Sequence, residues 1–367
     1  MIKFLDLHRQ YVSIKDEIDT AIADVIRDAA FVSGRYAAKF EGEFAAYQNA
    51  AHCIGCGNGT DAIEIALEAL QIPPGSEVIV PANTFIATSE AVTRTGHKVV
   101  FCDCDPDDYT ISVASMVQKI THRTRAVVVV HLYGQPCAMD QVLETAASHG
   151  LKVVEDCAQA HGADFMGRRV GALGHIGTFS FYPGKNLGAY GDAGAVVTND
   201  PELARRVRMI ANHGRTAKYD HAFEGRNSRL DGLQAAILSV KLRHLDEWLD
   251  RRISIAEFYH EALAGVGDLV LPTRRNWSKH AYHLFVVRTE RRDAIKKFLE
   301  AQGIETGIHY PIALPKLEAY RHLDQANEPF FANRSDARLL SLPIGDHMSN
   351  EDATRVASAV RDFFRHH

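Results

Sequence analysis

The sequence predicts an α/β protein with a mostly parallel sheet flanked by helices, followed by a small C-terminal α/β domain. Two observations lead to this prediction. Between residues 50 and 200, short apolar runs alternate with segments of helical periodicity, which is the pattern of βαβ units. Uninterrupted apolar runs such as "VVVV" are typical of strands that are covered on both faces. We expect a large domain over residues 1–245 and a small one over 246–367.

The elements of the large domain follow from these patterns in order. We expect apolar strands at 51–56, 76–81, 97–103, 125–134 and 151–156. Residues recurring at helical spacing predict helices at 60–70, 84–96, 112–120 and 139–150. The alternation then stops, and two short strands, 177–181 and 194–200, flank a glycine-rich loop.

A long helical pattern from about 230 to 264 is the natural connection between the two domains. After it, "AYHLFVVR" predicts a strand over 281–288 and "RRDAIKKFLEAQG" a helix over 291–303. "IETGIHYP" predicts a further strand over 304–311, and a final helix ends in "RDFFRHH". This order suits a small α/β domain.

Composition and charge exclude several classes of function. The chain has 367 residues, of which 46% are hydrophobic and 24% charged, as in ordinary soluble globular proteins. A net charge of −5 gives no electrostatic basis for binding nucleic acid or an anionic membrane. The longest apolar run, around 126–130, is too short to span a bilayer, and no signal peptide precedes it. We therefore expect a cytoplasmic protein without nucleic-acid or membrane partners.

Four of the six cysteines form two close pairs, Cys53 with Cys56 and Cys102 with Cys104. A metal site would require these pairs to converge, with His52 or His97 as further ligands. A single C-x-x-C pair without a second one at zinc-ribbon spacing does not establish such a site, and apolar strands explain the same residues. We expect no metal site and no disulfides.

The first candidate binding segment is "GCGNGTDAIEIALEAL", a glycine-rich turn that leads directly into a helix. Free backbone N–H groups and the helix dipole suit such a turn to a phosphate group. Gly55, Gly57 and Gly59 do not have the spacing of the dinucleotide fingerprint. The alternative is an ordinary helix cap by Thr60 or Asp61.

The second candidate segment, "LKVVEDCAQAHGA", ends a buried strand in Glu155 and Asp156. The carboxyl ends of parallel strands form the ligand crevice of such sheets. Because side chains alternate along a strand, only one of the two carboxylates can face that crevice. Gln159 and His161 follow on the same loop, and a helix cap by Asp156 is the alternative.

The third segment, "GTFSFYPGKNLGAYGD", holds Lys185 between a Pro-Gly turn and further glycines. It does not match the nucleotide-binding P-loop, because the glycine spacing differs and Asn186 follows the lysine. A partly desolvated lysine amine is a nucleophile that forms Schiff bases. A lysine, a carboxylate and a phosphate site are together what pyridoxal phosphate requires.

These segments, with "VIVPANTFIAT" and "GRNSRLDGLQAAIL", resemble the DegT/DnrJ/StrS aminotransferases over nearly the whole chain. The resemblance implies a fold-type I, pyridoxal-phosphate-dependent enzyme of nucleotide-sugar and deoxyamino-sugar biosynthesis. Lys185 would carry the cofactor as a Schiff base and then move a proton, while Asp156 would pair with the pyridine nitrogen. Phe85 would stack on the ring and Gln159 would bond its phenolic oxygen. Gly59, Thr60, Asp61 and Ser180 would surround the phosphate.

The resemblance also implies partners. Asn227 would reach the phosphate of a neighbouring subunit, which implies a homodimer with shared active sites. Glutamate is the expected amino donor, and the acceptor is expected to be a 3-keto sugar linked to dTDP or UDP, because "NSRLD" follows the form of such members. A 4-keto sugar, a keto-cyclitol, and a non-catalytic regulatory protein are the alternatives.

Four residues are candidates for binding the substrate: His161, Arg229, His309 and Tyr310. Arg229 could bind the donor carboxylate or pair with Asp231. His309 and Tyr310 lie in a "HYP" loop that departs from the family's usual continuation at Ala313 and Pro315.

Overall fold

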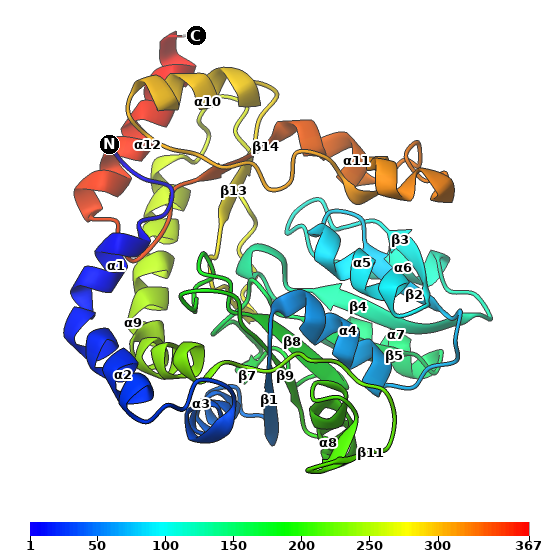
Figure 1. Cartoon of the computed structure of the whole chain (residues 1–367). Helices are drawn as coiled ribbons and strands as arrows, with labels where there is room; N and C mark the ends of the chain where they lie inside the picture. The colour runs from blue at the N-terminus through cyan, green and yellow to red at the C-terminus, as the bar shows by residue number, and fades with distance from the viewer. Residues whose placement is uncertain (367) are drawn as a thin grey trace.

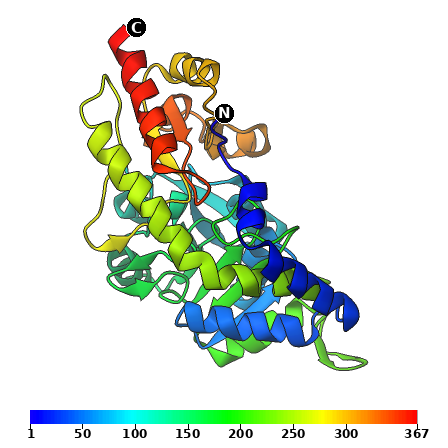
Figure 2. The same ribbon diagram turned by 90° about the vertical axis from the view of Figure 1, so that its left-hand side faces the viewer.

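The computed structural model describes residues 1–366. The long helical pattern of the sequence forms α9 (Gly232–Ala262), which runs from the part that contains the central sheet to the part that contains the C-terminus (Figures 1 and 2). No helix within residues 1–366 has the length and apolarity that crossing a bilayer requires.

The central sheet is mostly parallel, as predicted. Its strands are β1 (His52–Cys56), β2 (Glu77–Pro81), β3 (Lys98–Cys102), β4 (Thr124–Val130), β5 (Lys152–Asp156), β8 (Ile176–Ser180) and β9 (Gly194–Thr198). Within residues 1–366 this sheet has seven strands, in the order β1-β9-β8-β5-β4-β2-β3. β9 runs antiparallel to both of its neighbours, and the other strand pairs are parallel. The α/β prediction is therefore confirmed.

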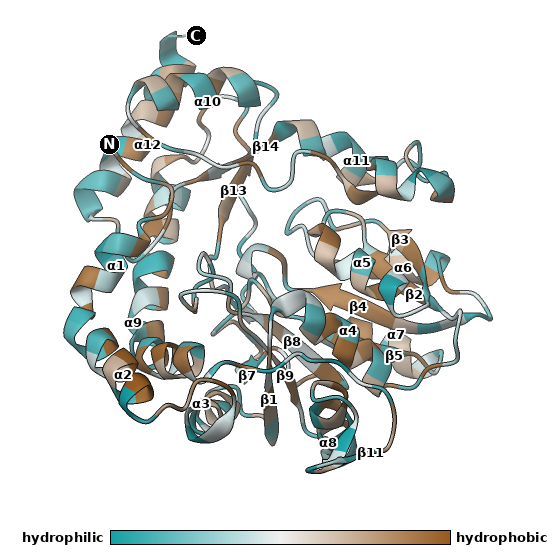
Figure 3. Cartoon of the chain, in the orientation of Figure 1, coloured by the Kyte–Doolittle hydropathy of each residue, from teal (hydrophilic) through white to brown (hydrophobic). Residues whose placement is uncertain are grey.

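Helices cover both faces of the central sheet. Along β4, Val127 and Val129 belong to one buried cluster, and Ala126 and Val128 belong to another. β4 is accordingly apolar along its length (Figure 3). The helices are α1 (Leu7–Ser13), α2 (Lys15–Arg27), α3 (Gly34–Tyr47), α4 (Gly59–Ala69), α5 (Ile86–Arg94), α6 (Val113–Gln118), α7 (Met139–Ser148), α8 (Pro201–Ile210), α10 (Arg292–Ala301), α11 (Phe331–Ser335) and α12 (Asn350–His366), with short 3-10 turns at Leu132–Gly134, Leu314–Lys316, Glu318–Leu323 and Asp336–Arg338.

The C-terminal part is built on an antiparallel pair, β13 (Phe285–Arg288) and β14 (Leu339–Leu342), with α10 and α12. The N-terminus joins this part, because Ile2 forms a bridge with Ile304 and lies in the same core cluster (Figures 1 and 2). The strand expected over 304–311 is wrong, since only isolated bridges form at Ile304 and Gly307 before the chain turns towards the central sheet. The remaining short strands are β6 (Asp164–Phe165), β7 (Arg168–Arg169), β10 (Arg215–Ala217), β11 (Asp220–His221) and β12 (Ser278–Lys279).

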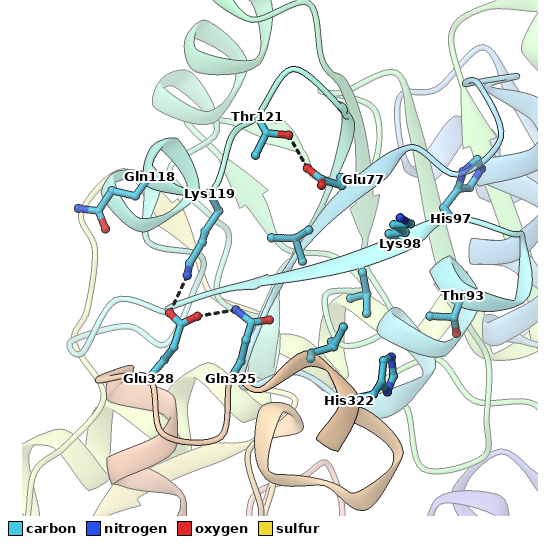
Figure 4. Close-up of a pocket in the computed structure, with 13 residues that line it drawn as sticks. Glu77, Thr93, His97, Lys98, Gln118, Lys119, Thr121, His322, Gln325 and Glu328 are labelled. Carbon is cyan, nitrogen blue, oxygen red and sulfur yellow. Dashed lines mark hydrogen bonds and ion pairs between the residues drawn. The ribbon is translucent and has the colours of Figure 1, made fainter.

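The segment 314–331 covers β3, the outermost strand on one side of the sheet. The side-chain amide of Gln325 accepts from the N–H of Phe101 at 3.4 Å and donates to its carbonyl at 3.3 Å. Lys119 pairs with Glu328 at 2.6 Å beside this contact (Figure 4). Asp103 accepts the backbone N–H groups at the start of α11. Gln325 thus takes the place of a neighbouring strand at this edge.

Candidate active site

Lys185 lies in the loop between β8 and β9, where its backbone N–H donates to the carbonyl of Tyr182 at 2.9 Å. Gly188 is the glycine that this loop requires, because a Cβ there would overlap the carbonyl oxygen of Pro183. A Cβ on Gly184, in contrast, would meet only ordinary contacts. The close approach therefore lies three residues after the lysine.

The amine of Lys185 faces a cavity and forms neither a hydrogen bond nor an ion pair within residues 1–366. Burial lowers the pKa of this amine to about 8, while the charge of Asp156 acts in the opposite direction. A larger share of the amine is thus neutral near pH 7 than for an exposed lysine, and the neutral form is the nucleophile.

Asp156 ends β5 and points into the same cavity. It accepts hydrogen bonds from the Thr88 hydroxyl at 2.8 Å and the Ala158 N–H at 3.0 Å. Burial raises the pKa of this carboxyl, and these hydrogen bonds and Lys185 oppose the rise. A cation placed beside Asp156 would favour its charged form.

Glu155 points to the other face of the sheet, as the strand alternation predicts. Its carboxylate accepts three backbone N–H groups, from Gly171, Leu173 and Gly174, and lies 3.0 Å from Nε2 of His131. Glu155 and His131 also approach Cys157, but the carboxylate oxygens are already occupied by these donors. This pair ties the strand to the following loop.

An anion cradle, formed by Gly59, Thr60 and Ser180, lies at the N-terminus of α4. Asn58 caps the helix by accepting the Asp61 N–H at 2.8 Å, which leaves the N–H groups of Gly59 and Thr60 without an intrahelical partner. Ser180 packs against this turn, and a Cβ on Gly59 would lie 2.5 Å from the Cβ of Ser180. Two backbone donors and two hydroxyl groups therefore meet where the helix dipole favours an anion.

Phe85, Gln159 and Tyr310 form another part of the cavity wall. Gln159 accepts the Tyr133 N–H at 2.6 Å and donates to the Tyr310 hydroxyl at 2.9 Å. The rings of Phe85 and Tyr310 lie 5.4 Å apart at an angle of 40°. Phe85 is 53% exposed, although it is a large aromatic residue, because it faces this open space.

The cavity has a volume of about 570 Å³. It brings together most of the cofactor residues expected from the sequence: Gly59, Thr60, Phe85, Asp156, Gln159, Ser180 and Lys185. A second cavity of about 240 Å³ adjoins it and shares Gln159, Tyr182, Lys185 and Tyr310. His309 lines only the smaller one.

Four predicted residues lie outside these two adjoining cavities. Asp61 accepts a hydrogen bond from the hydroxyl of Ser228 at 2.6 Å. Asn227 is exposed on the loop before α9. Arg229 lines a different cavity and forms no ion pair with Asp231 within the described part of the chain.

His161, the fourth, is fully buried between Phe179 and Phe181, with ring centroids 5.5 and 5.6 Å away. Burial lowers the pKa of its ring to about 3. Its place in the aromatic core, away from both cavities, gives it no access to a substrate in this structure.

Among the residues of the cavity walls that sequence reasoning missed are Thr88, Tyr182 and Arg252. Thr88 lies one helical turn after Phe85 in "NTFIAT", so helical spacing would have revealed it. Tyr182 lies two residues after the end of β8 and directly precedes the Pro-Gly turn. Arg252 lies within α9 among other charged residues, and no local signal separates it from a solvated position.

Comparison with known proteins places this geometry among aminotransferases. A sequence profile of the DegT/DnrJ/EryC1/StrS aminotransferase family matches residues 12–361. A dTDP-3-amino-3,4,6-trideoxy-alpha-D-glucose transaminase of Streptomyces venezuelae is 46% identical over 363 residues, covering 99% of this chain and 96% of the relative. A UDP-N-acetyl-3-dehydro-alpha-D-glucosamine 3-aminotransferase of Acidithiobacillus ferrooxidans is 43% identical over 360 residues, covering 98% and 97%.

A solved structure, Streptomyces venezuelae DesV in complex with a ketimine intermediate, matches with a TM-score of 0.98 at 46% identity, covering 100% of this chain and 99% of that one. These likenesses confirm both the predicted fold and the family resemblance seen in the sequence.

Proposed function

This chain belongs to the DegT/DnrJ/EryC1/StrS aminotransferase family, and on that premise we propose that it moves the amino group of glutamate to a keto nucleotide-sugar with pyridoxal phosphate as cofactor. One observation carries the proposal. The unpaired amine of Lys185, the buried carboxylate of Asp156 and the anion cradle at α4 all face one cavity. Together they are the groups that pyridoxal phosphate requires.

The residues of the cavity fit this cofactor. When bound, pyridoxal phosphate supplies an aldehyde that condenses with amines and a ring that accepts electrons. Gly59, Thr60 and Ser180 would hold the phosphate through the two free N–H groups and the two hydroxyl groups. Asp156 would face the ring nitrogen and keep it protonated, since a buried carboxylate is stabilised by an adjacent cation.

Lys185 would act twice. Its amine would hold the cofactor, and when it is free of the cofactor, Nζ would move a proton at the substrate carbon. A pKa of about 8 suits both tasks near neutral pH, because the amine can bind and release a proton with similar ease. Phe85 and Gln159 would hold the ring in place meanwhile.

We infer that the acceptor is a 3-keto sugar linked to dTDP or UDP. The names of the two relatives both refer to amination at carbon 3, one on a dTDP-sugar and the other on a UDP-sugar. The "NSRLD" segment, 227–231, supports the same position.

We also propose a homodimer in which Asn227 contacts the cofactor phosphate of the neighbouring subunit. Asn227 is exposed and lies outside its own chain's cavity, as such a role requires. The nearby Tyr219 and Phe223 are exposed aromatic residues, which is typical of a surface that another subunit covers.

Visible absorption of the purified protein tests this function. With added cofactor, the wild type should show the absorption band of lysine-bound pyridoxal phosphate, and glutamate should abolish that band. Lys185→Ala should bind the cofactor without forming the band. If the wild type forms no band with excess cofactor, the proposed function is wrong and the regulatory alternative takes its place.

A further inference from the structure

The smaller cavity differs in its walls from the one that would hold the cofactor. Beyond the residues that both share, it is lined by the N-terminal segment, by α9 and by loops of the C-terminal part. Its polar residues outside the shared set are Arg252, His283 and His309. Lys185 lies on the wall that is common to both cavities. If the amino group of a small donor lies at Lys185, the remainder of that donor molecule can occupy the smaller cavity.

Arg252 is the one strong charge on these walls besides Lys185. Its side chain is only 4% exposed, and Nη1 donates to the carbonyl oxygens of Tyr282, His283 and Ile344 at 3.1, 3.3 and 3.1 Å. Within residues 1–366, no carboxylate lies within 4.0 Å of this guanidinium, and its Nε and Nη2 atoms have no hydrogen-bond partner.

The nearest opposing charge is Asp346, which attracts Arg252 from beyond ion-pair distance and accepts a hydrogen bond from Gln10. A buried cation without a paired anion is costly, and leaving it so is unusual in a folded protein. An anion entering the cavity would therefore gain a charge-assisted contact with donors that are already in position.

We propose that Arg252 binds a carboxylate of the amino-acid donor in the smaller cavity. This inference rests on the proposed function, since it assigns one of that reaction's two substrates to a place. The planar guanidinium has two free donor positions, Nε and Nη2, which match the two oxygens of a carboxylate. A volume of about 240 Å³ is sufficient for a small amino acid between Lys185 and Arg252 but not for a nucleotide-linked sugar.

The other polar groups of the cavity add hydrogen bonds without adding charge. Nδ1 of His309 bonds the Ser341 hydroxyl at 2.8 Å, and Nδ1 of His283 lies 3.3 Å from the Asn186 side chain. Burial lowers the pKa of both rings, that of His309 to about 4, so both are neutral near pH 7. Besides Lys185, Arg252 is the group on these walls that supplies a counter-charge for the donor.

The competing role for Arg252 is structural, because its three carbonyl contacts tie α9 to the C-terminal loops. Arg251 provides a matched control. It is the neighbouring residue of α9, it donates twice to the Met348 carbonyl at 2.9 and 2.7 Å, and it does not line the cavity. Loss of a structural tie would affect both arginines, whereas loss of a carboxylate site would affect Arg252 only.

The test compares Arg252→Lys with Arg251→Lys as holoenzymes. We expect the glutamate concentration for half-maximal loss of the visible band to rise at least about tenfold in Arg252→Lys and to stay unchanged in Arg251→Lys. Reaction with benzylamine, an amine that lacks a carboxylate, should be equal in all three proteins. A benzylamine rate that falls together with the glutamate rate would show a structural role and overturn the proposal.

A second pair of variants leaves Arg252 in place. Leu5 lines the same cavity and is only partly buried, so a polar side chain is tolerable there. Leu5→Asp should weaken glutamate binding more than the neutral, similarly sized Leu5→Asn, because the added carboxylate competes for the guanidinium. Equal effects of the two substitutions would contradict the proposal.

Succinate separates this inference from the proposed function, because it binds without reacting. Succinate should raise the melting temperature of the wild type and of Arg251→Lys but not that of Arg252→Lys. Failure of glutamate to change the wild-type band refutes the proposed function. Failure of succinate to distinguish the two arginine variants refutes the role of Arg252.

Discussion

Lys185 and Asp156 influence each other's charge across the cavity. Each raises the other's tendency to be ionised, while burial opposes ionisation of both. The amine consequently titrates near pH 8, well within the range in which an enzyme can be assayed. Its protonation state can therefore be followed through the reaction in which it takes part.

Cofactor attachment should depend on pH through this amine. Mixing apoenzyme with pyridoxal phosphate should give a visible band whose rate of formation rises about tenfold per pH unit below 8 and levels off above it, because only the neutral amine reacts. In Asp156→Asn the midpoint should move to lower pH, since the carboxylate raises the pKa of Lys185. A stopped-flow series from pH 6 to 10, chosen to span that pKa, measures both. An unchanged midpoint would show that the charge of Asp156 does not influence the pKa of Lys185.

Gly59 is required because Ser180 packs against it. Gly59→Ala should raise the dissociation constant of the cofactor at least about tenfold, as the added Cβ displaces Ser180 from the anion cradle. The measurement is a fluorescence titration of apoenzyme with pyridoxal phosphate. Gly42→Ala is the control, because a Cβ there meets nothing within 4 Å. If Gly59→Ala and Gly42→Ala bind the cofactor with equal affinity, this turn does not contact the cofactor.

At the scale of elements, α9 supports the loop between β8 and β9 that carries Lys185. Lys241 donates from Nζ to the Gly188 carbonyl at 2.7 Å and lies 4.3 Å from the Tyr190 ring. Gln234, two helical turns earlier, accepts the Tyr190 N–H at 2.8 Å. One face of a helix thus positions the segment that follows Lys185, and this explains why the loop keeps its shape without strands of its own.

Because Lys241 is buried, the free energy of unfolding should increase with pH. Burial lowers the pKa of Lys241 to about 8, against 10.5 ordinarily, so the charged amine destabilises the fold below pH 8. This penalty is relieved as pH rises from 8 to 10.5, where the unfolded chain still binds the proton and the folded chain does not. The wild type should therefore gain stability relative to Lys241→Met over that range, as measured by urea unfolding.

A constant difference between the two proteins from pH 8 to 10 would mean that Lys241 titrates normally. Lys39→Met is the control. Lys39 is exposed on α3, so its substitution should leave the pH dependence unchanged.

At the scale of the whole molecule, the segment 314–331 covers the edge of a sheet whose strands lie between residues 52 and 198. Gln325→Ala should leave the N–H and carbonyl of Phe101 without partners and open the edge of β3 to other chains. Light scattering during incubation below the unfolding temperature should rise for this variant. It should not rise for Gln141→Ala, an exposed position on α7. Equal scattering would mean that the neighbouring contacts suffice to protect the edge.

The central sheet was predictable because βαβ units are local and repeat along the sequence. Strand ends and alternation predicted that one of Glu155 and Asp156 faces the crevice, and the choice of Asp156 came from the family resemblance. The contact between Gln159 and Tyr310 was not predictable, because the two residues lie 151 positions apart and no local pattern relates them. The same holds for Asp61, whose helix-start position suggested a ligand contact while its partner, Ser228, lies far along the chain.

The contact between the segment 314–331 and β3 also has a consequence for folding during translation. Synthesis runs from the N-terminus towards the C-terminus, so Phe101 leaves the ribosome before Gln325 has been made, and Ile2 leaves it before Ile304 has been made. Throughout that interval the nascent sheet has an open edge, at which chains on neighbouring ribosomes can pair. Substitutions between 314 and 331 should therefore reduce the yield of protein from cells more than they reduce the activity of molecules that have already folded.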